Sequence, residues 1–224
     1  MVEGYDPRDS MIRIVITGHK GQLGKALQRV LADNQILGLD LPEADITDPI
    51  SIVDAVVRFR PEVVIHTAAM TDVDGCERDP DLAFRVNVLG TQNVALACGR
   101  IGATMVHIST NDVFDGQLGR PYYEWDSPSP QSVYARSKAA AEFYVRTLLK
   151  RFYIVRTAWL YDRGGSNFVT KIIAAADKHG TLEVVTDEVS APAYAPDLAQ
   201  AIAQLIPTGH YVIYHFTNSG TCSR

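Results

Sequence analysis

Three glycines spaced G-x-x-G-x-x-G, at positions 18, 21 and 24, constrain this 224-residue chain more than any other feature. They lie between a β-branched run at 13–17, which predicts a buried strand, and an amphipathic run at 22–32, which predicts a helix. In that setting the first glycine permits a sharp turn, the second lets the backbone approach a pyrophosphate, and the third lets helix and strand pack closely. The helix N-terminus adds N–H groups and partial positive charge. The pattern therefore predicts a dinucleotide site that includes Gly18, Lys20, Gly21, Gln22, Leu23 and Gly24.

An acidic residue ends the next expected strand, which spans residues 36–39. This residue, Asp40, lies about 20 positions after the glycine loop, where a carboxylate can accept both hydroxyls of an adenosine ribose. Asp40 would repel a 2′-phosphate and so favours NAD(H). Lys20 can instead serve a phosphate and favours NADP(H). The cofactor is expected to be NADP(H) or NAD(H), with the choice left open.

Strands alternate with helices along the rest of the chain. Expected strands lie at 63–66, 105–109 and 153–156, and expected helices at 47–59, 82–100, 134–150, 168–179 and 197–205. Two stretches without periodicity, 114–133 and 187–196, are expected to be loops. This alternation predicts an α/β fold with a doubly wound parallel sheet and helices on both of its faces.

The composition excludes several classes of function. The formal net charge is −5 and no basic run occurs, so nucleic acid is not an expected partner. No apolar stretch approaches the ~20 residues of a membrane-spanning helix, and the polar, acidic first ten residues do not resemble a signal peptide. Three cysteines without a CxxC pair indicate reduced thiols in a cytoplasmic protein. The six histidines form no HExxH pair, so no metal is expected.

A tyrosine and a lysine four residues apart begin the expected helix at 134–150. At this spacing Tyr134 and Lys138 lie on one helix face. A nearby ammonium favours the phenolate, which would lower the tyrosine pKa from about 10 toward the range useful for general acid catalysis. An exposed pair with no catalytic role is equally compatible with the spacing alone. Thr110, just after the preceding strand, supplies a hydroxyl that can orient a carbonyl.

These residues together resemble the extended short-chain dehydrogenase/reductases, and within that family the branch of dTDP-4-dehydrorhamnose reductases. The matching segments run in order along nearly the whole chain: 17–24, 45–48, 66–69, 71–74, 86–87, 109–116, 134–138 and 156–161. The resemblance implies a Rossmann-fold reductase that transfers hydride from NAD(P)H to the 4-keto group of a dTDP-linked deoxysugar. It also implies three parts: an N-terminal extension at 1–10, the dinucleotide-binding domain at 11–162, and a partial substrate lobe at 163–224, interleaved with the last Rossmann elements.

The resemblance assigns a role to each matching residue. Thr110 would hydrogen-bond the 4-keto oxygen, Tyr134 would deliver the proton, and Lys138 would tune Tyr134 and hold the nicotinamide ribose. Further cofactor-binding residues are implied beside the adenine (Asp45, Ile46), along the middle of the cofactor (Ala68, Ala69, Thr71) and at Asn87. The implied substrate-binding residues are Thr71, Asn111 and Trp159. For Asn87 a structural role is an equal alternative, and for Trp159 a place in the core or an interface.

Two departures from the family pattern keep other functions open. Asn111 and Asp112 replace an acidic and an aromatic residue, which changes the polarity beside the substrate and admits a reductase or epimerase of another nucleotide sugar. Family members also continue beyond the position of Arg224, through the segment that completes the nucleotide-sugar lobe, so a truncated lobe is expected here. A non-catalytic regulatory module, similar to the β subunit of methionine adenosyltransferase, is therefore the alternative. A homodimer is also implied by the resemblance.

Overall fold

Six parallel strands form the central sheet of the computed structural model, which describes residues 11–163 and 167–223. Their order across the sheet is β2-β1-β3-β4-β5-β9, and every neighbouring pair is parallel. The strands are β1 (Arg13–Thr17), β2 (Gln35–Leu39), β3 (Val63–His66), β4 (Thr104–Thr110), β5 (Phe152–Thr157) and β9 (Ile213–His215). The predicted α/β fold with a doubly wound parallel sheet is confirmed.

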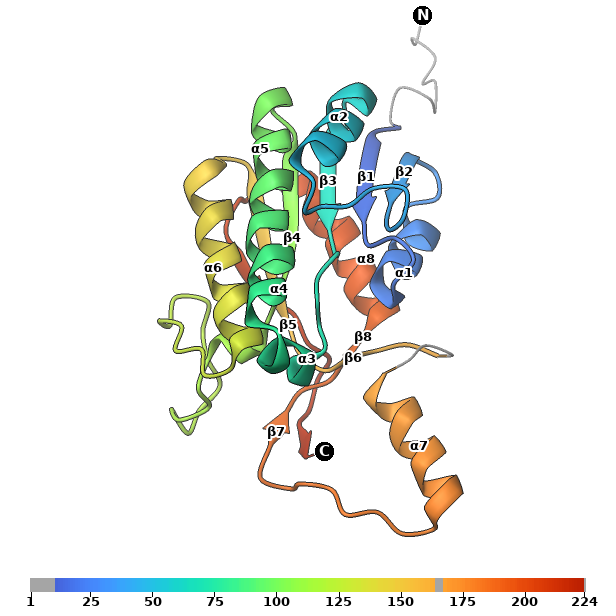
Figure 1. Ribbon diagram of the computed structural model, residues 1–224, viewed down its shortest axis with the longest axis vertical. Helices are drawn as coiled ribbons and strands as arrows, with labels where there is room; N and C mark the ends of the chain where they lie inside the picture. Colours follow the sequence, from blue (N-terminus) through green and yellow to red (C-terminus); the bar gives the residue numbers. More distant parts are fainter. Residues whose placement is uncertain (1–10, 164–166, 224) are drawn as a thin grey trace, which may run out of the picture.

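Helices cover both faces of this sheet (Figure 1). One layer consists of α2 (Pro49–Phe59), α5 (Thr91–Ile101) and α6 (Val133–Leu148), and the other of α1 (Gln22–Val30) and α8 (Ala195–Leu205). Alternate strand residues serve the two layers: Val15 and Met105 pack with the first, and Ile14 and Ile65 with the second. Burial on both faces explains why the strands read as continuous apolar runs.

Side-chain caps fix where the helices begin. The Asp48 carboxylate accepts from Ile50 N at 2.9 Å, and Pro49 occupies the first turn, where a missing N–H costs nothing. The Ser132 hydroxyl accepts from Ala135 N at 3.0 Å, and Val133 N donates to Glu77 Oε1 at 2.7 Å. These contacts start α6 one residue before Tyr134.

The helix expected at 82–100 is present, with one irregularity. Residues 80–101 are helical throughout, as α4 (Pro80–Phe84), a π-helix (Arg85–Gly90) and α5, and a separate short helix, α3 (Val73–Arg78), comes before them. Asp79 and Pro80 separate α3 from α4, since proline cannot continue a helix hydrogen-bond ladder. The π-helix contains the buried Asn87, whose amide bonds to the chain outside the helix. Single π-helical turns of this kind are frequent at functional sites.

Several short elements near the C-terminus were not expected. Strand β9 completes the sheet beside β5, and the stretch 187–196 holds β7 (Val189–Ser190) and β8 (Ala193–Tyr194). Strand β8 pairs with β6 (Leu160–Tyr161), and β7 with β10 (Cys222–Ser223). Helix α7 (Phe168–His179), at the bounds predicted, has no buried residue and stands apart from the two helix layers (Figure 1).

Two histidines lie stacked inside the sheet layer, with ring centroids 5.5 Å apart. The ring of His66 hydrogen-bonds the hydroxyls of Thr17 and Thr91, at 2.7 and 3.0 Å. Neither ring nitrogen of His107 has a hydrogen-bond partner among the described residues. Burial, followed by the charge of Lys138, lowers the pKa of His66 to about 3 and that of His107 well below its usual value.

Acidification from pH 7 to 5.5 is therefore expected to lower the free energy of unfolding. Histidines with an unfolded pKa near 6.5 bind protons that the buried rings do not, so stability is complete above that pH and is lost below it. Each ring accounts for about 1 kcal/mol of the loss over this interval. His107→Leu should reduce the loss by that amount in urea titrations at the two pH values. The exposed His210→Gln is the control and should change nothing; an equal loss in wild type and His107→Leu would contradict the prediction.

Candidate active site

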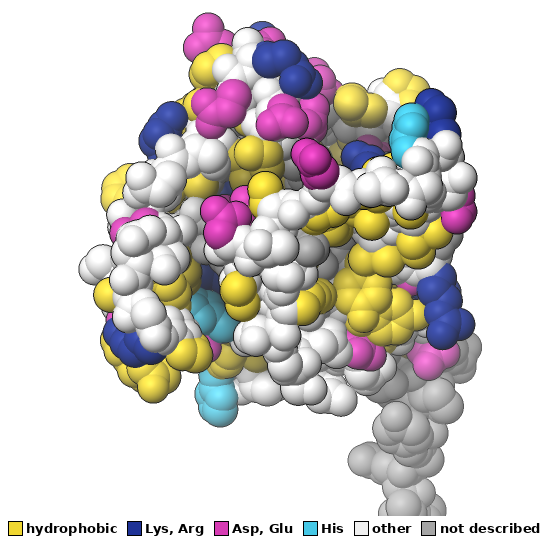
Figure 2. All heavy atoms as spheres, turned by 90° about the horizontal axis from the view of Figure 1, so that it is seen from below, with side chains coloured by type: hydrophobic (Ala, Val, Ile, Leu, Met, Phe, Trp, Pro, Cys, Tyr) yellow, Lys and Arg dark blue, Asp and Glu magenta, His cyan; other side chains and the backbone are white. Residues whose placement is uncertain are grey.

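The predicted site residues gather at the carboxyl edge of the sheet, where the loops after β1, β3, β4 and β5 meet. The chain leaves β1 toward β2 on one side, while β3 lies on the other, so the order of strands reverses between β1 and β3. Ligands of open α/β sheets bind at such a switch point. Figure 2 looks onto the molecule from this end and shows hydrophobic and acidic side chains interspersed over the surface.

The three loop glycines each meet a different steric demand. Gly18 has φ +72°, and a Cβ there would lie 2.7 Å from Ala68 N, on the loop after β3. At Gly24 a Cβ would lie 2.5 Å from Gly18 O. At Gly21 a Cβ would meet Gly18 O at 3.2 Å and, apart from its chain neighbours, no further atom of the described residues within 4 Å, so this exposed stretch of backbone faces open space. That open face beside the start of α1 fits the pyrophosphate of a dinucleotide.

The second half of the glycine loop also connects to the start of α7. Gln22 Oε1 accepts from Asn167 Nδ2 at 3.1 Å, and Asn167, buried, caps α7 by accepting from Thr170 N at 3.0 Å. Leu23 is buried against the sheet, so its side chain faces the core and only its backbone lies in the loop. Helix α7 is thereby joined to the loop, although the two lie far apart in sequence.

A cluster of charges marks the expected ribose end of the site. Asp40 accepts from Lys20 N at 3.1 Å and from Leu41 N at 2.9 Å. The Lys20 ammonium donates to Leu41 O at 2.7 Å and to Glu43 Oε2 at 2.8 Å. The hydrogen bond from Lys20 lowers the pKa of Glu43. Sequence reasoning missed Glu43, although a second carboxylate three residues after Asp40 was a visible signal.

The residues expected along the adenine and the middle of the cofactor come together between the loops after β2 and β3. Asp45 Oδ1 accepts from Thr47 N at 2.8 Å, and the buried Ile46 has its carbonyl held by Asn93 Nδ2 at 2.9 Å. Ala68 and Ala69 directly follow β3 and are half-buried. Thr71 is exposed, just before α3. The structure thus places these five on the segments that follow β2 and β3.

Both the oxygen and the nitrogen of the Asn87 side-chain amide form hydrogen bonds within the protein. Its oxygen accepts from Met70 N at 2.8 Å, while its nitrogen donates to Met70 O at 3.1 Å and to Ser137 Oγ at 2.9 Å. It therefore joins the loop after β3 to α6. These contacts support the structural alternative, and a direct contact with the cofactor stays a prediction.

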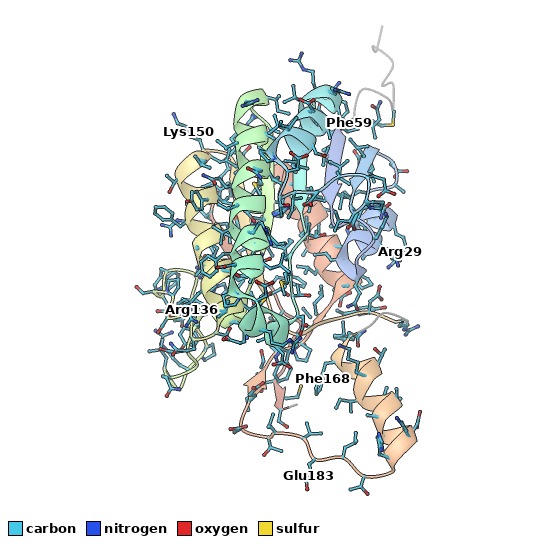
Figure 3. All side chains as sticks on the ribbon, viewed as in Figure 1. Arg29, Phe59, Arg136, Lys150, Phe168 and Glu183 are labelled. Carbon is cyan, nitrogen blue, oxygen red and sulfur yellow. The ribbon has the colours of Figure 1, made fainter. Side chains whose placement is uncertain are left out.

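Tyr134, Lys138 and Thr110 meet where α6 crosses the end of β4. In Figure 3 the labelled Arg136 marks the end of α6 at the carboxyl edge, and Lys150 lies beyond its far end. The Tyr134 side chain lies close enough to Thr110 for the threonine to act on the tyrosine pKa. The buried Lys138 donates from Nζ to Ile108 O at 2.7 Å. The Thr110 hydroxyl accepts from Asp112 N at 3.1 Å.

The electrostatics of Tyr134 differ from the expectation. Its pKa is raised, not lowered, because burial of the phenol dominates and the charge of Asp112 adds to it; only the Thr110 hydrogen bond acts in the other direction. Burial lowers the pKa of Lys138 to about 8, so this ammonium still carries its proton at neutral pH. In this structure Tyr134 is therefore a phenol at neutral pH, the form that can give up a proton.

The expected substrate residues flank this centre. Asn111 and Asp112 form the short 3-10 helix directly after β4, next to Thr110. Trp159 follows β5 and has φ +42°, in the left-handed region that is unusual for a bulky side chain. Backbone strain of this kind is concentrated at functional sites. Substrate contacts of Asn111 and Trp159 stay predictions.

Neither a metal-binding cluster nor a membrane-spanning helix is found within residues 11–163 and 167–223. No group of three or more His, Cys, Asp or Glu side chains is arranged to hold a metal ion there. Over the same residues, no helix combines the length and apolar character needed to cross a bilayer.

Known proteins are similar to this chain in both sequence and structure. Residues 12–224 match the family described as RmlD substrate binding domain. The chain is 42% identical over 220 residues to dTDP-4-dehydrorhamnose reductase of Mycobacterium tuberculosis, which covers 95% of the chain and 72% of that relative. It superposes on dTDP-4-dehydrorhamnose reductase from Bacillus anthracis in complex with NADP with a TM-score of 0.92 at 40% identity, over 95% and 76% of the two chains. For UDP-glucose 4-epimerase of Thermus thermophilus in complex with NAD the TM-score is 0.81 at 27% identity, over 95% and 79%.

Gly24→Ala is expected to destabilise the fold by about 2 kcal/mol, because overpacking displaces backbone atoms that cannot give way. The Cβ would meet Gly18 O and His19 Cα at 2.5 and 2.6 Å. Gly99→Ala in α5 is the matched control: its Cβ would make an ordinary contact with Leu149 Cδ2 at 3.7 Å, and alanine favours a helix by about 1 kcal/mol. Urea unfolding should move in opposite directions for the two variants, and equal stabilities would contradict the steric argument.

Proposed function

The chain belongs to the RmlD substrate binding domain family, and we propose that it acts as a dTDP-4-dehydrorhamnose reductase in which Tyr134 is the proton donor. The observation that carries this proposal is the meeting of Tyr134, Thr110 and Lys138 beside the glycine loop. A reduced nicotinamide, when bound there, supplies the hydride for the 4-keto carbon of the sugar. The 27%-identical epimerase shares the fold, but the reductases match this chain at higher identity.

The Gly18–Gly24 loop, Asp40 and the Asp45–Ile46 turn are the groups that would hold the dinucleotide. The backbone at Gly21 faces open space for the pyrophosphate, and the carboxylate of Asp40 lies at the end of β2, where a ribose is expected. NADPH and NADH both fit these residues, since Lys20 and the two carboxylates Asp40 and Glu43 lie together.

Proton transfer is the task of Tyr134. The carbonyl carbon gains a hydride and its oxygen takes the phenolic proton, so the ketone becomes a secondary alcohol and Tyr134 is left as a phenolate. Its raised pKa keeps Tyr134 protonated until the oxygen becomes basic. The ammonium of Lys138, one helix turn away, stabilises the phenolate, and solvent returns the proton.

The hydroxyl of Thr110 orients the carbonyl. Asp112 N donates to the Thr110 hydroxyl at 3.1 Å and holds it at the carboxyl end of β4, beside Tyr134. Two hydroxyls directed at one oxygen stabilise the negative charge that develops there. Thr71, Asn111 and Trp159 are proposed to contact the dTDP-sugar, and a homodimer stays a prediction of the family resemblance.

Oxidation of NADPH and of NADH, each with dTDP-4-dehydrorhamnose, tests the proposal directly. Loss of the 340 nm absorbance that depends on the sugar is the expected result. Binding of the dinucleotide without turnover would contradict it and would favour a regulatory module.

Tyr134→Phe should reduce kcat by about 10²- to 10⁴-fold, because the variant lacks the transferable proton. The dissociation constant for NADPH should change less than about 3-fold, since one hydroxyl contributes little to cofactor binding. Tyr144→Phe removes a hydroxyl from the same helix, away from Thr110, and should leave kcat at the wild-type value. Wild-type turnover by Tyr134→Phe would remove the tyrosine from the mechanism.

Glu43→Gln should raise the affinity for NADPH relative to NADH by about 3-fold. The exposed Lys20 ammonium then loses a carboxylate partner at 2.8 Å, and the site repels a 2′-phosphate less. The double variant Lys20→Gln/Glu43→Gln removes both charges and should not show the gain. Dissociation constants of both cofactors, from quenching of protein fluorescence, give the ratio; an unchanged ratio in Glu43→Gln would refute the idea.

A further inference from the structure

A carboxylate that the reaction does not use lies buried behind the catalytic residues, on the inner face of α6. We propose that this residue, Glu142, is a positioning residue: it fixes α6 on β4 and β5 and holds the Lys138 ammonium in its working place. The role is stated for the reductase reaction and so rests on the proposed function.

Glu142 binds two strands at once. Its Oε1 accepts from Ser109 Oγ of β4 at 2.5 Å and from Arg156 Nε of β5 at 2.9 Å. Its Oε2 accepts from Arg156 Nη2 at 2.7 Å, which makes the ion pair bidentate. Both charged residues are only 3% exposed. A bidentate, charge-assisted contact of this kind fixes direction as well as distance.

The same strand segment receives three side chains of α6 spaced four residues apart. Tyr134 lies beside Thr110, Lys138 donates to Ile108 O at 2.7 Å, and Glu142 accepts from Ser109. Positions 134, 138 and 142 lie on one face of the helix, so they act as one row. Glu142 anchors the far end of this row, and a shift of α6 along β4 would separate Tyr134 from Thr110.

The other side of Arg156 faces the loop after β4. Its guanidinium carbon lies 5.0 Å from the ring centroid of Phe114, and its Nη1 lies 3.4 Å from His215 Nε2. The Phe114 ring stacks on Tyr122 at 4.2 Å. The Glu142–Arg156 pair therefore joins the catalytic helix to the loop that begins at Asn111 and Asp112.

Glu142 also acts on Lys138 through its charge. Burial lowers the pKa of Lys138 to about 8, and the Glu142 carboxylate opposes that shift. The other titratable groups around this region are His66 of β3, His107 of β4, Arg156 of β5 and Tyr134 of the same helix. The two histidines and the phenol are uncharged at neutral pH, and Arg156 forms an ion pair with Glu142, so Glu142 is the nearby anion that raises the pKa of Lys138.

Stability alone does not require this ion pair. Replacing a buried pair by apolar residues of similar volume is often neutral or stabilising, whereas removing one partner leaves an uncompensated charge. A positional role and a purely structural role can therefore be separated by comparing single and double variants.

Glu142→Gln keeps the volume and can still accept from Ser109, but lacks the charge. We expect kcat to fall about 10-fold or more with little change in KM, and the alkaline limb of the pH–rate profile to move to lower pH as Lys138 loses its proton earlier. Ser109→Ala keeps the carboxylate and loses one neutral hydrogen bond, so its alkaline limb should stay at the wild-type pH. A Glu142→Gln profile with wild-type kcat and limb would overturn the proposal.

The double variant Glu142→Leu/Arg156→Met tests whether a lower kcat results merely from unfolding. It should melt near the wild-type temperature and still show the reduced kcat and the shifted limb. A folded double variant with wild-type kcat and pH profile would make Glu142 a stability residue only, and the proposal would fail.

An NMR titration of Lys138 gives a readout that needs no turnover. The lysine side-chain carbons are followed against pH in wild type and in Glu142→Gln, with Lys138 assigned by Lys138→Arg. The Lys138 pKa should be lower in Glu142→Gln, and an unchanged pKa would overturn the charge role. If wild type does not oxidise NADPH or NADH, the proposed function fails, while this titration still decides whether Glu142 holds Lys138 charged.

Discussion

The close approach of the loops after β1 and β3 is the constraint on which the rest of the structure depends. Gly18 lies so near the backbone of Ala68 that a side chain would not fit, and Thr67 Oγ1 donates to Thr17 O at 2.7 Å. The two strand ends are thereby held together at the point where the strand order reverses. Helix α1 begins next to that point, and the carboxyl ends of β2 and β4 lie on either side of it. A dinucleotide site is a consequence of this geometry rather than an addition to it.

Three buried polar side chains fix the position of α6. Asn87 joins this helix to the loop after β3, Lys138 joins it to a β4 carbonyl, and Glu142 joins it to β4 and β5. Each contact is buried, so each would cost free energy if it were left unmade. Tyr134, near the start of the helix, is thus held close to Thr110 by several fixed contacts further along α6.

Secondary structure was predictable wherever one local rule acted alone. The β1 strand, the glycine turn and the Phe168–His179 helix match the prediction, because β-branched runs, glycine spacing and capping need no distant partner. The helix expected at 82–100 is present, but its π-helical turn could not be predicted, since Asn87 in that turn bonds to Met70 outside the helix. Strand β9 was missed although 211–216 is rich in β-branched and aromatic residues, because its short run is stable only beside β5.

The sequence by itself determined the α/β class, the glycine loop, Asp40 and the Tyr134–Lys138 spacing, since each depends on local periodicity or on a motif of fixed length. Only the tertiary structure decided the electrostatics: it raises the pKa of Tyr134, aims Lys138 at Ile108 O, and pairs Lys20 with Glu43. Burial and the direction of a long side chain depend on residues brought together from distant parts of the chain. For the same reason the link from Glu142 to Ser109 and Arg156, which spans three elements, could not be predicted from spacing alone.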